Sequence, residues 1–118
     1  MLRYNNVNKI HPMIKAFRVF ENIVELNGLI EDIKEYCKKI ILYGSCSRGE
    51  DTVSSDIDLF VLTSEDKEFI REKITKYDLK RPIKAVIVDP LEFAKLREED
   101  KVFLDEVEKG ILLYHRGN

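Results

Sequence analysis

Residues 39–62 read KIILYGSCSRGEDTVSSDIDLFVL, and this stretch decides the fold. It begins and ends with apolar, β-rich runs, at residues 39–43 and 56–62, which are typical of buried strands. Between these runs lies a polar segment that begins at Gly44 and also contains Gly49. The stretch therefore predicts two strands of a sheet that are joined by a polar turn.

The acidic residues Asp56 and Asp58 alternate with apolar residues in the second run. Residues two apart in a strand point the same way, with side chains roughly 6.5–7 Å apart, so both acids can converge on one or two hard cations. Gly44 ends the first run, and without a Cβ it lets backbone N–H groups and the Ser45 hydroxyl approach a phosphate. Together these residues predict a site for a divalent metal and a nucleoside triphosphate. Solvated acids on an edge strand and a plain turn would explain each feature singly but not their combination.

The rest of the chain alternates helical and strand patterns. Helices are predicted over residues 12–26, about 29–37, 65–77, about 90–97 and about 100–109, with Pro12 as the first helical residue and a break at Asn27-Gly28. A third strand is predicted over residues 83–88, and a short edge strand over 111–114. This order describes an α/β (α+β) fold, a small mixed sheet with helices packed mainly on one face.

The chain has 118 residues, enough for one compact domain. We expect a single domain over residues 1–118, with an N-terminal helical segment (1–37) and a core (38–115). The net charge of −2 gives no general attraction to nucleic acid or to an anionic membrane. Cys37 and Cys46 fit no zinc spacing and are expected to be free thiols, and no signal peptide or membrane-spanning run is evident, so a cytoplasmic location is expected.

The pattern GSxxRG at residues 44–49, followed by SDIDL at 55–59, resembles the signature of the DNA polymerase β-like nucleotidyltransferases, in the short form called minimal nucleotidyltransferases. The resemblance covers most of residues 38–115 and implies a nucleotidyltransferase-like fold. It implies that Asp56 and Asp58 are catalytic and bind Mg²⁺ (or Mn²⁺), and that a nucleoside triphosphate is the substrate. The residues that it places at the nucleotide phosphates are Gly44, Ser45, Arg48 and Ser55. Arg48 is either such a phosphate ligand or a structural partner of one of the acids.

One departure from the family pattern concerns a third carboxylate. Active members usually carry an acid near the start of the strand beside the Asp-x-Asp strand, and the corresponding position here is about Lys84. Asp89 is the nearby alternative, but an Asp followed by Pro and then by Glu92 at the third helical position predicts a helix capping box. Loss of the third acid is expected to weaken the chemical step more than triphosphate binding.

Two classes of function follow. The first is a metal-dependent enzyme that transfers a nucleoside monophosphate from a nucleoside triphosphate to a hydroxyl. By resemblance, the acceptor lies on a partner such as a small helical HEPN-type protein in a toxin–antitoxin pair. The second is a catalytically weak or inactive nucleotide-binding module that acts by contact, which Lys84 favours. A purely structural dimerisation domain would leave the paired aspartates unexplained. Surplus apolar residues in the N-terminal helices suggest a homodimer.

Overall fold

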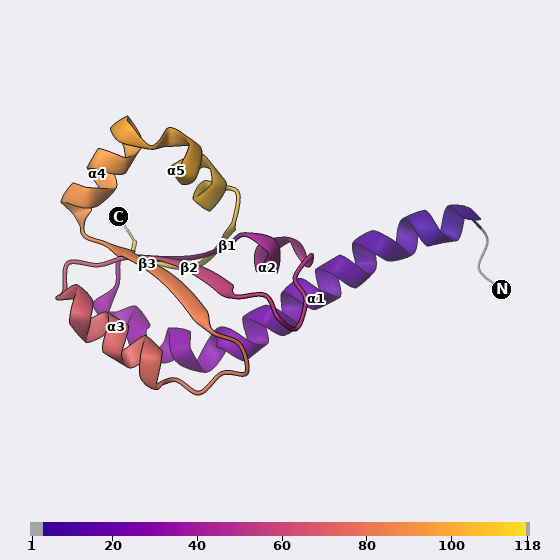
Figure 1. The fold of residues 1–118 in the computed structure, drawn as a ribbon, viewed down its shortest axis with the longest axis horizontal. Helices are drawn as coiled ribbons and strands as arrows, with labels where there is room; N and C mark the ends of the chain where they lie inside the picture. Colours follow the sequence, from indigo (N-terminus) through magenta and orange to yellow (C-terminus); the bar gives the residue numbers. More distant parts are fainter. Residues whose placement is uncertain (1–3, 118) are drawn as a thin grey trace.

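The computed structural model describes residues 4–117, with side chains described from residue 11 onward. Helices and strands alternate along the chain (Figure 1). In chain order the elements are α1 (Tyr4–Ile33), the 3-10 turn η1 (Lys34–Tyr36), β1 (Lys39–Tyr43), α2 (Ser45–Arg48), β2 (Ile57–Leu62), α3 (Lys67–Lys76), β3 (Ile83–Val88), α4 (Pro90–Glu99), α5 (Lys101–Glu108) and β4 (Ile111–His115).

The four strands form one mixed sheet in the order β3-β2-β1-β4. β1 pairs antiparallel with both β2 and β4, whereas β2 and β3 run parallel. The predicted strands are therefore confirmed, and so is the mixed sheet. The register of the antiparallel pair sets Tyr43 opposite Asp58, so the end of β1 and the start of β2 meet at one edge of the sheet.

Helices cover both faces of this sheet (Figure 1). The larger core lies where α1 and α3 pack on one face, around buried residues such as Leu26, Leu59 and Ile70. This face carries most of the helical packing, as the sequence predicted. A smaller cluster under α4 and α5, centred on Phe60 and Val107, closes the opposite face. The sequence prediction did not include this second layer.

The predicted break at Asn27-Gly28 is wrong, because α1 continues through both residues to Ile33. A Cβ at Gly28 would lie 1.6 Å from the Tyr77 hydroxyl oxygen, so the glycine makes room for Tyr77 rather than ending the helix. Pro12 also lies inside α1 and does not begin it. Residues 11–17 around it are all exposed.

The segment after Gly44 was predicted as an irregular turn, but it contains the one-turn helix α2. This helix ends at Gly49, which has a left-handed φ of 70°. A Cβ at Gly49 would lie 2.2 Å from the backbone oxygen of Lys15, so α2 is packed tightly against α1. This contact fixes the start of the loop that leads to Asp56 and Asp58.

Candidate active site

Asp58 lies against the Gly44 turn at the edge of the sheet. Gly44 has φ 72° and ψ −159°, and a Cβ added to it would lie 2.5 Å from Asp58 Oδ2. Any larger residue would therefore push against the carboxylate and would also be strained at this φ. The Asp58 carboxylate therefore packs directly against the Gly44 turn.

Asp56 precedes β2 and is exposed, whereas Asp58 is half-buried. Within residues 11–117, neither carboxylate has a hydrogen-bond donor or an ion-pair partner. Burial raises the pKa of Asp58, Lys84 lowers it and Asp56 raises it, and the net result is a pKa above the ordinary value of an aspartate. Two adjacent acids without partners are a site that a cation would stabilise.

Lys84 lies beside Asp58, because the parallel register of β2 and β3 pairs these two residues directly. Its side chain is exposed, and no ion pair within 4 Å is found for it in the described part of the chain. Among the described residues, no group of three or more His, Cys, Asp or Glu side chains is placed to hold a metal ion. The structure therefore places Lys84 beside Asp58, where the family pattern has a third acid.

Asp89 forms the capping box of α4 and does not supply the missing acid. Its carboxylate accepts a hydrogen bond from Glu92 N at 2.8 Å, and Glu92 Oε1 accepts one from Asp89 N at 3.1 Å. This confirms the capping prediction. Ser55 stabilises the turn that precedes β2, since its hydroxyl oxygen accepts a hydrogen bond from Thr52 N at 2.9 Å.

Arg48 contacts neither of the two acids. Its guanidinium pairs with Glu50 at 2.9 Å and with Glu106 of α5 at 3.0 Å. The alternative in which Arg48 is the structural partner of Asp56 or Asp58 is therefore not what the structure shows. Both pairs are about half exposed, and such pairs are weak enough to exchange for a phosphate.

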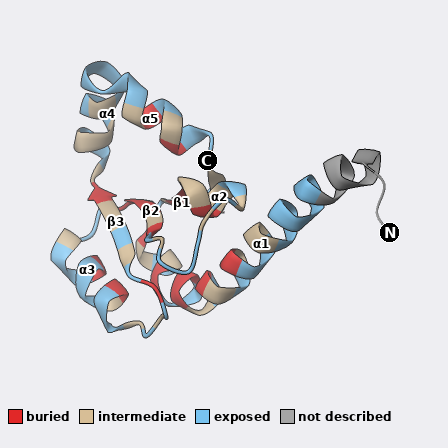
Figure 2. Ribbon diagram, turned by 45° about the vertical axis from the view of Figure 1, so that its right-hand side comes forward, coloured by how far each residue is buried: buried red, intermediate tan, exposed pale blue. Residues whose placement is uncertain are grey.

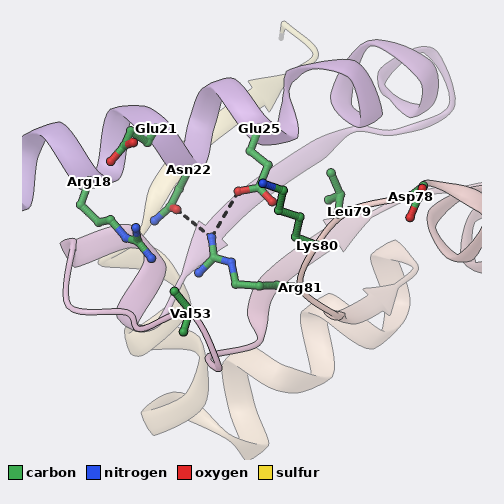
Figure 3. A pocket seen from close by; sticks show the side chains of 9 residues that line it. All are labelled: Arg18, Glu21, Asn22, Glu25, Val53, Asp78, Leu79, Lys80 and Arg81. Carbon is green, nitrogen blue, oxygen red and sulfur yellow. Dashed lines mark hydrogen bonds and ion pairs between the residues drawn. The ribbon is translucent and has the colours of Figure 1, made fainter.

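A buried polar network holds the loop that leads to Asp56 and Asp58, and sequence reasoning missed it. The Asp51 carboxylate is fully buried and accepts from Arg81 at 2.6 Å, from Asn22 at 3.1 Å and from Arg18 at 3.1 Å. Arg81 also donates to Asn22 Oδ1 at 2.8 Å and pairs with Glu25 (Figure 3). The loop is thereby tied both to α1 and to the segment before β3.

The same network sets the charge state of Asp51. Burial alone would raise the pKa of Asp51, but hydrogen bonds from Arg81 and Asn22 and the nearby Arg18 outweigh it, so the pKa lies below its ordinary value. Arg18, Asn22 and Glu25 follow one another at spacings of four and three, which places three polar side chains on one face of α1. That spacing was the signal in the sequence.

The two cysteines are free and buried, as predicted. The Cys46 thiol donates to the backbone oxygen of Asp56 at 3.6 Å and accepts from Arg81 at 3.6 Å. Burial raises its pKa, and burial also raises the pKa of Cys37 to about 11. Cys46 is thus a packing residue beneath the acids and not a nucleophile.

A four-stranded mixed sheet with two carboxylates beside a glycine turn, neither of them partnered by a described side chain, is the arrangement expected of a nucleotidyltransferase. Residues 21–118 match the family model described as "Polymerase beta, Nucleotidyltransferase". A protein of Methanocaldococcus jannaschii described as a "putative protein adenylyltransferase" is 31% identical over 90 residues, which cover 75% of this chain and 90% of that protein. The chain therefore belongs to the polymerase β nucleotidyltransferase family.

Solved structures agree with this assignment. A chain of a toxin–antitoxin crystal structure with AMP-PNP is 27% identical, with a TM-score of 0.55 over 80% of this chain and 74% of that chain. A Sulfolobus solfataricus structure described as a "putative nucleotidyltransferase" has the same fold at 16% identity, with a TM-score of 0.56 over 86% of this chain and 87% of that chain. None of the helices in residues 4–117 combines the length and the apolar character needed to cross a bilayer.

Proposed function

We propose that this protein transfers a nucleoside monophosphate from a nucleoside triphosphate to a hydroxyl group at the Gly44/Asp58 edge of the sheet. The acceptor hydroxyl loses its proton to water as its oxygen forms a bond to the α-phosphorus, the bond from that phosphorus to the bridging oxygen breaks, and pyrophosphate leaves. The observation that carries the proposal is the contact between the Asp58 carboxylate and the Gly44 turn, with Asp56 beside it and no partner for either acid among residues 11–117. Family membership supports it.

Each residue of the site has a proposed role. Gly44 and Ser45 receive the triphosphate, because the turn has no Cβ in the way and offers backbone N–H groups and a hydroxyl. Arg48 follows the Gly44 turn in α2, and its half-exposed ion pairs with Glu50 and Glu106 can be exchanged for a contact with a phosphate. Ser55 shapes the turn before Asp56 and reaches the nucleotide only if its bond to Thr52 opens.

Asp56 and Asp58 fit a divalent cation such as Mg²⁺ or Mn²⁺. Hard cations prefer carboxylate oxygens, and these two carboxylates are adjacent and unpartnered. A bound cation would neutralise negative charge on the triphosphate and lower the pKa of an attacking hydroxyl. The two acids would hold it, and Lys84 adds a fixed positive charge at their side.

The proposed acceptor lies on a partner protein. Residues 4–117 form one sheet with its helices, and we propose that the surface of a second protein presents the hydroxyl to the Gly44/Asp58 edge. The similarity to a relative described as a protein adenylyltransferase and to a toxin–antitoxin chain with AMP-PNP supports ATP as the nucleotide and a toxin–antitoxin setting. A small helical HEPN-type protein is the partner that we propose for that setting.

The second candidate function is a nucleotide-binding module with little or no transfer activity. The lysine that occupies the usual place of a third acid favours it. In this reading Lys84 balances Asp58 and holds the triphosphate, but no third carboxylate helps to activate the acceptor hydroxyl.

The test measures nucleotide binding and transfer separately. The chain is mixed with Mg²⁺ and α-labelled ATP, with and without a HEPN-type protein, and label transfer, pyrophosphate release and ATP affinity are recorded for the wild type and for Asp58→Asn. Transfer that disappears in the variant supports the enzyme. ATP binding without transfer to any acceptor supports the binding module, and absence of ATP binding with Mg²⁺ overturns both.

A further inference from the structure

The long helix α1 has two apolar sides, and only one of them is covered. Buried residues such as Leu26, Leu29 and Ile33 pack on the sheet. The opposite side carries five large apolar side chains that are each between 57% and 69% exposed: Met13, Ile14, Phe17, Phe20 and Val24. A surface helix of a monomer needs only one apolar side, so the second one calls for a partner.

The exposed residues form a regular seam, which we call the α1 seam: Met13, Phe17, Phe20 and Val24. Their spacings of four, three and four are those of the a and d positions of a coiled coil, and none of the four is charged. The N-terminal part of α1 projects beyond the sheet and its C-terminal part is docked on it (Figure 2). The seam spans both parts, since Met13 lies among residues that are all exposed and Val24 is followed by buried Leu26. A second helix with the same spacing would pack along its whole length.

We propose that the α1 seam joins two copies of this chain as an antiparallel helix pair. A twofold axis between Phe17 and Phe20 superimposes the seam on itself, so that Phe17 of one copy meets Phe20 of the other and Met13 meets Val24. Phe20 and Val24 are exposed on the docked half of α1. In the pair, the projecting half of the second helix packs against them. The antiparallel arrangement places the two sheets at opposite ends of the pair and keeps them apart.

The area is sufficient for a stable dimer. The four seam residues and the flanking Ile14 each expose roughly 100 Å², so a pair that covered all five on both helices would bury on the order of 1,000 Å², which is the lower limit of specific interfaces. α1 is already folded because its C-terminal half is part of the core, so association does not bear the cost of forming the helix. This inference goes beyond the proposed function, since the seam lies on the helix side that faces away from the sheet.

The experiment is sedimentation of the full chain between 1 and 100 µM, concentrations on the order of common dissociation constants. We expect a species of twice the 13.9 kDa chain mass, and we expect Phe17→Glu/Phe20→Glu to raise the dissociation constant by about 100-fold or more without changing helicity. The matched control is Val102→Glu, which alters an exposed apolar residue on α5 and should leave the dimer intact.

A disulfide test fixes the orientation. Phe17→Cys mixed with Phe20→Cys should cross-link under mild oxidation more than either variant alone, whereas a parallel pair would favour like with like. Cys37 and Cys46 are buried and do not interfere. A chain that is monomeric at the highest concentration, a dimer that survives Phe17→Glu/Phe20→Glu, or a seam that binds only a HEPN-type protein would each overturn the proposal.

Discussion

Lys84 lies directly beside Asp58 in the register of the parallel strands β3 and β2. A lysine side chain thus occupies the position at which the family pattern has a third acid. The amine lowers the pKa of Asp58, while burial and Asp56 raise it, and the carboxylate remains harder to ionise than usual. In the part of the chain whose side chains are described, the site therefore combines two acids that lack partners, Asp56 and Asp58, with the positive charge of Lys84. Substitutions at Lys84 and Asp58 can show how much each residue contributes to metal binding and to nucleotide transfer.

Replacing Lys84 by an acid should strengthen metal binding. With Lys84→Asp, we expect Mg²⁺ affinity and transfer from ATP to rise by about tenfold or more, because a third carboxylate joins Asp56 and Asp58. Titration with Mn²⁺ and label transfer are the measurements, and Lys84→Gln is the control that removes the charge alone. Equal effects of the two variants would show that only charge matters at this position.

Replacing Asp58 should separate function from stability. Its raised pKa means that the ionised side chain disfavours the folded state at neutral pH, so Asp58→Asn should leave the melting temperature unchanged or raise it by a few degrees. Transfer should fall by about 100-fold or more, because a metal ligand is lost. The matched control is Asp105→Asn, which makes the same substitution at an exposed position of α5. A marked loss of stability in Asp58→Asn would assign the residue a structural role instead.

Breaking the buried network should unfold the loop that carries the site. In Asp51→Ala, Arg81 keeps a buried charge without its main partner, so we expect a loss of about 3 kcal/mol in the free energy of unfolding. Urea denaturation measures it, and Asp51→Leu/Arg81→Met should lose less than the sum of the two single variants. Glu31→Ala, which breaks an exposed pair with Lys34, should change stability by less than about 0.5 kcal/mol.

Acid should weaken the fold through Asp51. Its pKa is lowered in the folded chain, so the unfolded chain takes up the proton first as the pH falls. The contribution of Asp51 is fully present above about pH 4 and is lost as the pH falls through the lower folded-state value. The free energy of unfolding should therefore drop more steeply below pH 4 in the wild type than in Asp51→Asn. Parallel pH profiles would contradict this assignment.

Gly28 offers a test of helix packing. Gly28→Ala should destabilise the wild type by about 1–3 kcal/mol, because the new methyl group meets the Tyr77 ring. In a Tyr77→Ala background the sign should reverse, since alanine is the better helix former by about 1 kcal/mol. Thermal unfolding of the four variants measures both effects, and a loss in both backgrounds would show that the glycine serves another contact.

The sequence by itself determined the features that depend on neighbouring residues. Strand patterns, the Gly44 turn, the alternation of Asp56 and Asp58 and the Asp89 capping box all rest on backbone geometry over a few residues, and the structure bears out their placement. The departure at Lys84 was also visible in the sequence, because the family pattern has an acid at about this position. The register of β2 and β3 then sets Lys84 beside Asp58.

Tertiary structure alone decided the contacts between distant parts of the chain. Gly28 does not end α1, because Tyr77, far along the chain, lies in the space of its absent side chain. Asp51 accepts hydrogen bonds from Asn22 and Arg81, which belong to separate parts of the chain. Arg48 pairs with Glu106 of α5 and does not contact Asp56 or Asp58. Helical spacing can show that polar residues such as Arg18 and Asn22 share one face of α1, but no local pattern shows which distant residues that face contacts. Burial gives these contacts the free energy to override local preference.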